Sequence, residues 1–102
     1  MKRTIEIMPE ANQDMMEIWL YSYWNFGEYQ ADQYSQNMHK LLFKLAVHEL
    51  GRKRTELGKQ VYSMPYGQHI IIYRTEPARI IIGRILHHTQ DATAITFSNL
   101  FI

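Results

Sequence analysis

The chain has 102 residues, a formal net charge of +1 and no cysteine. This length suits one domain, and a hydrophobic share of 46% can build a core, which argues against a disordered chain. Disulfides and thiolate–metal sites are excluded, which fits a reducing cytoplasm. The apolar runs are only a few residues long, so neither a signal peptide nor a membrane span is expected.

Charge is divided unevenly along the chain. Residues 1–51 carry four Lys/Arg and seven Asp/Glu, whereas residues 52–102 carry seven Lys/Arg and three Asp/Glu. The first half therefore sums to −3 and the second to +4. The basic half indicates a polyanion or an acidic partner on that side, or else ordinary surface charge.

The first half predicts a strand and two helices. Alternation from Thr4 to Met8 predicts a short strand, and Pro9 then opens a helix that Gly27 ends. The apolar face expected for this helix is Ala11, Met15, Ile18, Trp19, Ser22 and Phe26. The second helix is expected from Glu28 to His48, with Ala31, Tyr34, Met38, Leu41, Leu42 and Leu45 on one face. The link is so short that the helices must form an antiparallel hairpin.

The second half predicts strands. After a basic link over residues 52–59, we expect strands at Val61–Met64, Gln68–Tyr73 and Arg79–Leu86, the last two buried on both faces. Pro65 and Gly67 are expected to shape the first turn. The apolar segment 93–102 is an extra edge strand or a docking tail. Residues 1–102 thus predict a single α+β domain, with the helical hairpin packed on a small, mostly antiparallel twisted sheet.

Two arginines on neighbouring strands are candidates for contacting a target. Arg74 and Arg84 suit phosphate or carboxylate groups, because the guanidinium group binds both in a bidentate manner. The alternative is an ordinary salt bridge to Glu10, Glu17 or Asp91.

Two adjacent histidines close the last strand. His87 and His88 are expected to point to opposite faces, and one is a candidate general acid or base. The alternative is that one hydrogen-bonds the strand end while the other is solvated. Neighbouring strand residues cannot chelate a metal from one side, so no metal is expected, and no cofactor motif is present.

The helical turn is rich in aromatic residues. One helix cannot direct all of them inward, so part of the set is expected on an exposed surface that binds a protein partner. The residues are Trp19, Tyr21, Tyr23, Trp24, Phe26 and Tyr29.

Short segments spread over residues 4–91 resemble the ParE/RelE superfamily of bacterial toxin–antitoxin systems, more closely its ParE, plasmid-stabilisation branch. Their order and spacing match, as does the predicted order of elements. The segments are Ala11–Asp14 with Ile18, Gly27–Ala31 with Tyr34, Leu50–Arg52, Glu56–Gly58, Ser63–Pro65, His69–Arg74 and Arg84–His87 with Asp91.

The resemblance implies a toxin neutralised by a ParD-like antitoxin in a hetero-oligomer. ParE-like members are taken to inhibit DNA gyrase, which would make Arg74, Arg84, His87 and Asp91 target-binding residues. The antitoxin is expected on Trp19, Tyr23, Trp24 and Tyr29. RelE-like members cleave mRNA on the ribosome, and the corresponding catalytic set here would be His69, Arg74, Arg84, His87 and His88.

That nuclease set is incomplete, because His69 stands at a position where RelE-like members carry arginine. Tyr62 also departs from the ParE pattern, in which many relatives carry arginine. The resemblance therefore favours a non-catalytic gyrase inhibitor. A ribosome-dependent endoribonuclease and an inactive, antitoxin-binding relative stay open as alternatives.

Overall fold

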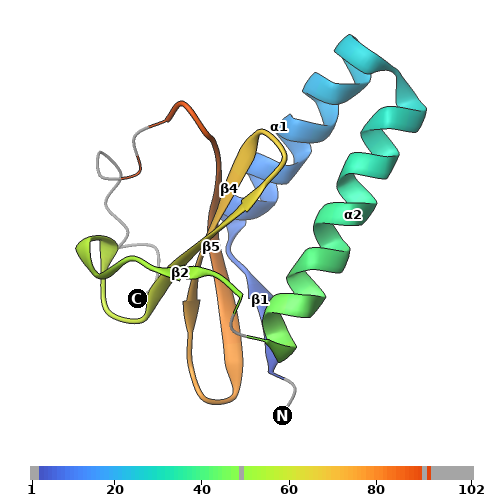
Figure 1. Cartoon of the computed structure of the whole chain (residues 1–102). Helices are drawn as coiled ribbons and strands as arrows, with labels where there is room; N and C mark the ends of the chain where they lie inside the picture. Colours follow the sequence, from blue (N-terminus) through green and yellow to red (C-terminus); the bar gives the residue numbers. More distant parts are fainter. Residues whose placement is uncertain (1–2, 49, 91, 93–102) are drawn as a thin grey trace.

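A five-stranded sheet with two helices on one face forms the framework of the molecule (Figure 1). The computed structural model describes residues 3–48, 50–90 and 92. The elements in chain order are β1 (Thr4–Ile7), α1 (Pro9–Phe26), α2 (Glu28–Val47), β2 (Arg52–Lys53), the 3-10 turn η1 (Thr55–Leu57), β3 (Val61–Tyr66), β4 (His69–Thr75) and β5 (Arg79–His87).

The strands lie in the order β1-β5-β4-β3-β2. β1 pairs with β5 in parallel, and the other three pairs are antiparallel. The parallel pair follows from the helical hairpin, which carries the chain back along the sheet between β1 and the later strands. The predicted α+β fold, with a helical hairpin on a mostly antiparallel sheet, is confirmed.

Gly27 alone joins the two helices. Its φ of 91° lies in a region that side chains rarely adopt, and its N–H donates to the carbonyl of Tyr23 at the end of α1. Its own carbonyl accepts the N–H of Ala31, in the first turn of α2. One residue therefore ends α1 and starts α2, which sets the helices side by side as the sequence predicted (Figure 1).

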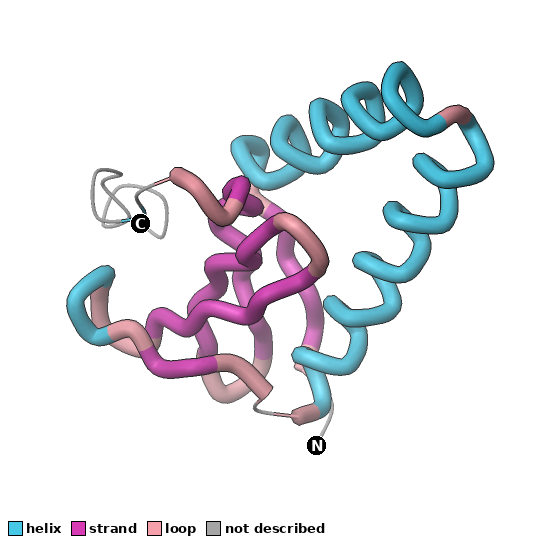
Figure 2. Tube along the Cα trace, turned by 45° about the horizontal axis from the view of Figure 1, so that its top comes forward, coloured by secondary structure: helices cyan, strands magenta, loops and turns pink. Residues whose placement is uncertain are grey.

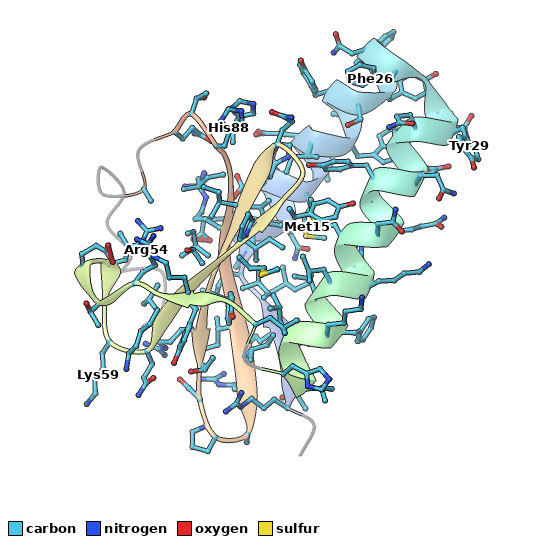
Figure 3. All side chains as sticks on the ribbon, in the orientation of Figure 1. Met15, Phe26, Tyr29, Arg54, Lys59 and His88 are labelled. Atoms are coloured by element: carbon cyan, nitrogen blue, oxygen red, sulfur yellow. The ribbon has the colours of Figure 1, made fainter. Side chains whose placement is uncertain are left out.

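The main core lies between the hairpin and the sheet. Met15 points into this layer (Figure 3). The fully buried members of this core are Ala11, Met38, Leu42, Leu45, Ala46, Ile71, Tyr73, Ile80, Ile82 and Ile85. Trp19, which the sequence placed on this face, is not part of the core and hydrogen-bonds Asp32 on α2 instead.

A second apolar cluster occupies the other face of the same strands. It consists of Val61, Ile72, Ile81 and Leu86, all at most 3% exposed, and we call it the second-face cluster. Because successive strand residues point to opposite faces, Ile71 and Ile72 belong to different clusters. The prediction that these strands are buried on both faces is confirmed.

Three local expectations were wrong. β3 continues through Pro65, which the sequence placed in a turn. This is tolerated because β2 pairs with β3 only at Tyr62 and Ser63, so β3 is an edge strand at Pro65. The basic link 52–59 contains β2 and η1. Phe26 is 66% exposed rather than inward-facing, because the tip of the hairpin extends beyond the sheet.

The expectations for Asp91 and for the segment 93–102 lie outside the described residues. Within the described part of the chain, no helix is long and apolar enough to cross a membrane.

Candidate functional site

A cleft of about 710 Å³ opens between the helical hairpin and the end of the sheet. One wall comes from α1 and the start of α2, and the other from the β3–β4 turn and the end of β5. Three of the residues proposed to bind a target or to act in catalysis line it: His69, Arg84 and His87. His88 lies at the same end of the sheet (Figure 3). The cleft is therefore our candidate functional site.

An ion pair between α1 and β5 forms part of the cleft wall. Arg84 donates from Nε to Oδ2 of Asp14 at 2.7 Å and from Nη2 to Oδ1 at 3.1 Å. Asp14 is only 8% exposed, and its hydrogen bonds raise the pKa of Arg84. The alternative of a salt bridge is confirmed for Arg84, but its partner is Asp14 rather than Glu10 or Glu17, and Asp91 lies outside the described residues.

Tyr34 links α2 to the turn between β3 and β4. Its hydroxyl lies 2.7 Å from Nδ1 of His69, 3.1 Å from the carbonyl of Tyr66 and 3.2 Å from the backbone nitrogen of Gln68. In the opposite direction, the hydroxyl of Tyr66 donates a hydrogen bond to the backbone carbonyl of Tyr34 at 2.7 Å. Gly67 has a φ of +53°, and a Cβ there would stand 2.6 Å from the Tyr34 hydroxyl oxygen.

The same contacts assign the tautomer of His69. The Tyr34 hydroxyl has one hydrogen to donate, and the Tyr66 carbonyl can only accept it. All three contacts are hydrogen bonds only if Nδ1 of His69 carries the other hydrogen and donates to Tyr34. Nε2 is then an unprotonated acceptor. Tyr34 thereby holds His69 as an oriented base.

Three histidines gather at this end of the sheet. The ring centroids of His69 and His87 are 5.6 Å apart, and those of His87 and His88 are 4.4 Å apart. Burial lowers the pKa of His69, and the proximity of His87 and His88 lowers it further. The expectation that His87 and His88 face opposite sides was wrong, because β5 ends at His87 and His88 belongs to the following turn.

Arg74 does not join this cluster. It pairs with Glu76 at 2.8 Å, in the turn after β4, and Glu76 also accepts from Nε of Arg79 at 2.7 Å. The hydrogen bond from Arg79 lowers the pKa of Glu76 most, and the hydrogen bond from Arg74 lowers it further. Arg74 lies five residues along β4 from His69, a separation of roughly 16 Å at the usual rise of a strand. The alternative of a salt bridge is therefore confirmed for Arg74, but Glu76 is not among the three acids proposed as its partner.

An exposed aromatic surface covers the tip of the hairpin, and we call it the aromatic tip. Its members are Tyr21, Tyr23, Trp24, Phe26 and Tyr29, of which Trp24 is 78% exposed and Tyr29 is 77% exposed. Tyr29 points away from the sheet (Figure 3), whereas Tyr21 and Phe26 also line the cleft. Trp19 is half-buried and stacks on Tyr23, with their ring centroids 5.2 Å apart, so it supports this surface from beneath.

Asp14 and Tyr34 are the site residues that sequence reasoning missed. A signal existed for Asp14, which lies between Ala11 and Ile18 on the apolar face of α1, where a carboxylate needs a partner. Tyr34 was placed on the apolar face of α2, but its hydroxyl also needed a partner. Among the described residues, no three His, Asp or Glu side chains gather in a way that could hold a metal ion.

Toxins of bacterial toxin–antitoxin systems share this fold. The chromosomal ParDE system from P. aeruginosa superposes with a TM-score of 0.70 at 18% identity, over 84% of this chain and 96% of that one. The RelBE2 toxin–antitoxin complex from Mycobacterium tuberculosis gives 0.65 at 18% identity, over 86% and 100%. The YoeB–YefM complex from Staphylococcus aureus gives 0.54 at 19% identity, over 86% and 99%.

Sequence similarity assigns the chain to one family within this class of toxins. Residues 5–92 match the family described as the ParE toxin of type II toxin–antitoxin systems, parDE. Toxin ParE1 of Caulobacter vibrioides is 29% identical over 85 residues, covering 82% of this chain and 88% of that protein. Toxin ParE1 of Mycobacterium tuberculosis is 29% identical over 87 residues, covering 83% and 89%. The chain belongs to the ParE toxin family.

Proposed function

We propose that this toxin inhibits DNA gyrase by binding it, with no bond made or broken by the chain. The observation that carries the proposal is that Arg74 and Arg84, the two candidate arginines, already form ion pairs within the chain. A nuclease needs cations gathered around the scissile phosphate together with an acid or base. Arg84 is held by Asp14, and Arg74 is paired with Glu76 at the other end of β4. Similarity to proteins named Toxin ParE1 supports the ParE branch of the superfamily, for which the sequence resemblance implies gyrase as the target.

In this proposal the cleft is the part of the toxin that meets its target. Arg84 and His87 line it, and Arg84 can donate to carboxylates or backbone carbonyls of the target from Nη1, which takes no part in its two hydrogen bonds to Asp14. Arg74 and Asp91 are further proposed contacts outside the cleft lining. A target of this kind places the toxin in the cytoplasm.

A ribosome-dependent endoribonuclease is the second candidate, and one observation favours it. Tyr34 orients His69 so that Nε2 is an acceptor, and the pKa of His69 is lowered, which keeps this base neutral at physiological pH. An enzyme would use His69 with His87, His88 and Arg84 in the cleft, and Arg74 would have to reach the site from a distance.

Two assays with one variant separate these functions. The purified chain and its His69→Gln variant are compared for inhibition of gyrase supercoiling and for cleavage of ribosome-bound mRNA, with His39→Gln as the control. His39 is exposed on α2, outside the cleft. We expect both variants and the unchanged chain to inhibit supercoiling and to leave mRNA intact. Cleavage that is lost in His69→Gln but kept in His39→Gln, with supercoiling untouched, would replace the gyrase proposal by the nuclease.

The partner proposed for the resting state is an antitoxin. The solved structures that share the fold are toxin–antitoxin systems, which supports such a partner here. The aromatic tip, with Trp19 beneath it, is the proposed contact, because large exposed aromatic side chains favour binding to an amphipathic helix.

A further inference from the structure

The second-face cluster is buried although neither helix reaches it. Val61, Ile72, Ile81 and Leu86 are at most 3% exposed, on the face of the sheet that points away from α1 and α2. Figure 2 shows both helices on one side of the sheet and η1 on the other. A sheet covered on one face normally alternates apolar and polar residues, whereas β4 and β5 are apolar on both faces. This face therefore requires a cover of its own.

The described residues supply only part of that cover. The apolar side chains packed against the second-face cluster, among the described residues, are Met8, Leu57, Ile70 and Ala92. Leu57 comes from the short turn η1, Met8 from the link between β1 and α1, and Ile70 from the cluster's own sheet. Ala92 is the last described residue before the segment 93–102, so the chain leaves the described region while in contact with this cluster.

The segment that follows Ala92 has the composition of a buried cover. Residues 93–102 contain no charged side chain, and six of the ten are apolar: Ala94, Ile95, Phe97, Leu100, Phe101 and Ile102. Extended, ten residues reach about 33 Å, whereas β5 and β3 are separated by two strand spacings, about 10 Å. The segment is long enough to cross the cluster.

We propose that residues 93–102 dock across the second-face cluster and complete the core on that side of the sheet. Docking is favoured over an added edge strand because β4 covers one edge of β5, β1 covers the other as far as Ile82, and the carboxylate of Asp14 caps that second edge at Ile85. In the free toxin this face is closed by its own tail. A protein partner that uses this face must displace residues 93–102.

A paramagnetic label on the tail tests this placement in the full chain. The chain has no cysteine, so Asn99→Cys provides a single site for a nitroxide. Adjacent isoleucines on the same strands are matched controls, because Ile72 and Ile81 face the cluster whereas Ile71 and Ile82 face the helices. We expect the methyl signals of Ile72 and Ile81 to broaden, and those of Ile71 and Ile82 to broaden far less. Equal broadening of both pairs, or broadening of neither, would overturn the proposal.

A stability measurement with a matched charge change checks the same point. Phe97→Asp places a carboxylate where the proposal puts an apolar contact, and Asn99→Asp adds the same charge at a polar position of the tail. We expect Phe97→Asp to lower Tm by about 5 °C or more and Asn99→Asp to change it by about 1–2 °C or less. Equal melting temperatures for the two variants would show that the tail does not dock. Neither experiment depends on gyrase, so the proposed target and the proposed docking fail separately.

Discussion

The carboxylate of Asp14 on α1 accepts the backbone N–H of Ile85 on β5, as the carbonyl of a neighbouring strand would. β1 pairs with β5 only from Arg79 to Ile82, so the outer edge of β5 is open beyond that point. Oδ2 of Asp14 accepts the backbone N–H of Ile85 at 2.9 Å and the Nε–H of Arg84 at 2.7 Å. One buried acid thereby caps the sheet edge and fixes the arginine that lines the cleft.

Replacing this acid tests its structural role. Asp14→Asn keeps the size but removes the charge, so we expect the free energy of unfolding to fall by about 1.5–3 kcal/mol, the range for hydrogen bonds to charged groups. Glu17→Gln is the control, because Glu17 lies on the same helix and its carboxylate accepts only from Gln13 among the described hydrogen bonds. Urea denaturation measures both. Equal values for the two variants would mean that Asp14 does not hold the sheet edge.

Gly67 and Tyr34 make a second pair that can be tested. A Cβ at Gly67 would meet the Tyr34 hydroxyl at 2.6 Å, whereas a Cβ at Gly27 would meet nothing within 4 Å. Both glycines have positive φ, so alanine strains the backbone at either site. We expect Gly67→Ala to cost about 1–2 kcal/mol more than Gly27→Ala, because it also displaces the Tyr34 hydrogen bonds. A cost at Gly67 no larger than that at Gly27, by thermal or urea unfolding, would show that the Tyr34 hydrogen bonds do not depend on Gly67.

Leu42 tests the core between the hairpin and the sheet. It is 2% exposed on α2, so Leu42→Ala is expected to lower the free energy of unfolding by about 2–5 kcal/mol through lost burial and a residual cavity. Met16→Ala on α1 is the matched control, because Met16 is 59% exposed and its loss is expected to cost about 0.5 kcal/mol or less. The prediction fails if urea denaturation gives similar values for both.

Periodicity made the fold predictable from the sequence. The positions of Gly27, Met38 and Leu42 each agreed with a local rule for helix ends or apolar spacing, and these rules also fixed the hairpin. The ends of β3 could not be predicted in this way, because whether Pro65 is tolerated depends on how far β2 extends along its neighbour.

The site was predictable only in part, for a related reason. Residue types identified Arg84 and His87, and the family resemblance identified His69; all three line the cleft. Their partners depend on long-range contacts, since Asp14 and Arg84 are separated by 70 residues and Tyr34 and His69 by 35. Local sequence patterns carry no information about which acid or hydroxyl will meet a given cation or imidazole.

The histidine cluster predicts how stability depends on pH. The pKa of His69 is lowered by burial and by His87 and His88, so between its folded and ordinary values the unfolded chain binds more protons than the folded one. The free energy of unfolding therefore falls as pH drops below about 6.5, the ordinary histidine value, until the folded-state pKa is passed. His69→Gln is expected to flatten this dependence, whereas His39→Gln is not. Identical slopes for His69→Gln and the unchanged chain, in denaturation series at several pH values, would contradict the assignment.

The aromatic tip predicts where an antitoxin binds. Trp24 and Tyr29 are the most exposed of its side chains, so removing them leaves the packed core intact. Truncating a central aromatic contact typically costs about 2 kcal/mol or more, so we expect Trp24→Ala and Tyr29→Ala each to weaken binding of the proposed antitoxin at least tenfold. Phe43→Ala is the control, because Phe43 is exposed on α2 outside the tip. Calorimetry measures the affinities and circular dichroism confirms the fold. If Phe43→Ala weakens binding and the two tip variants do not, the antitoxin docks along α2 and the aromatic tip is left to another partner.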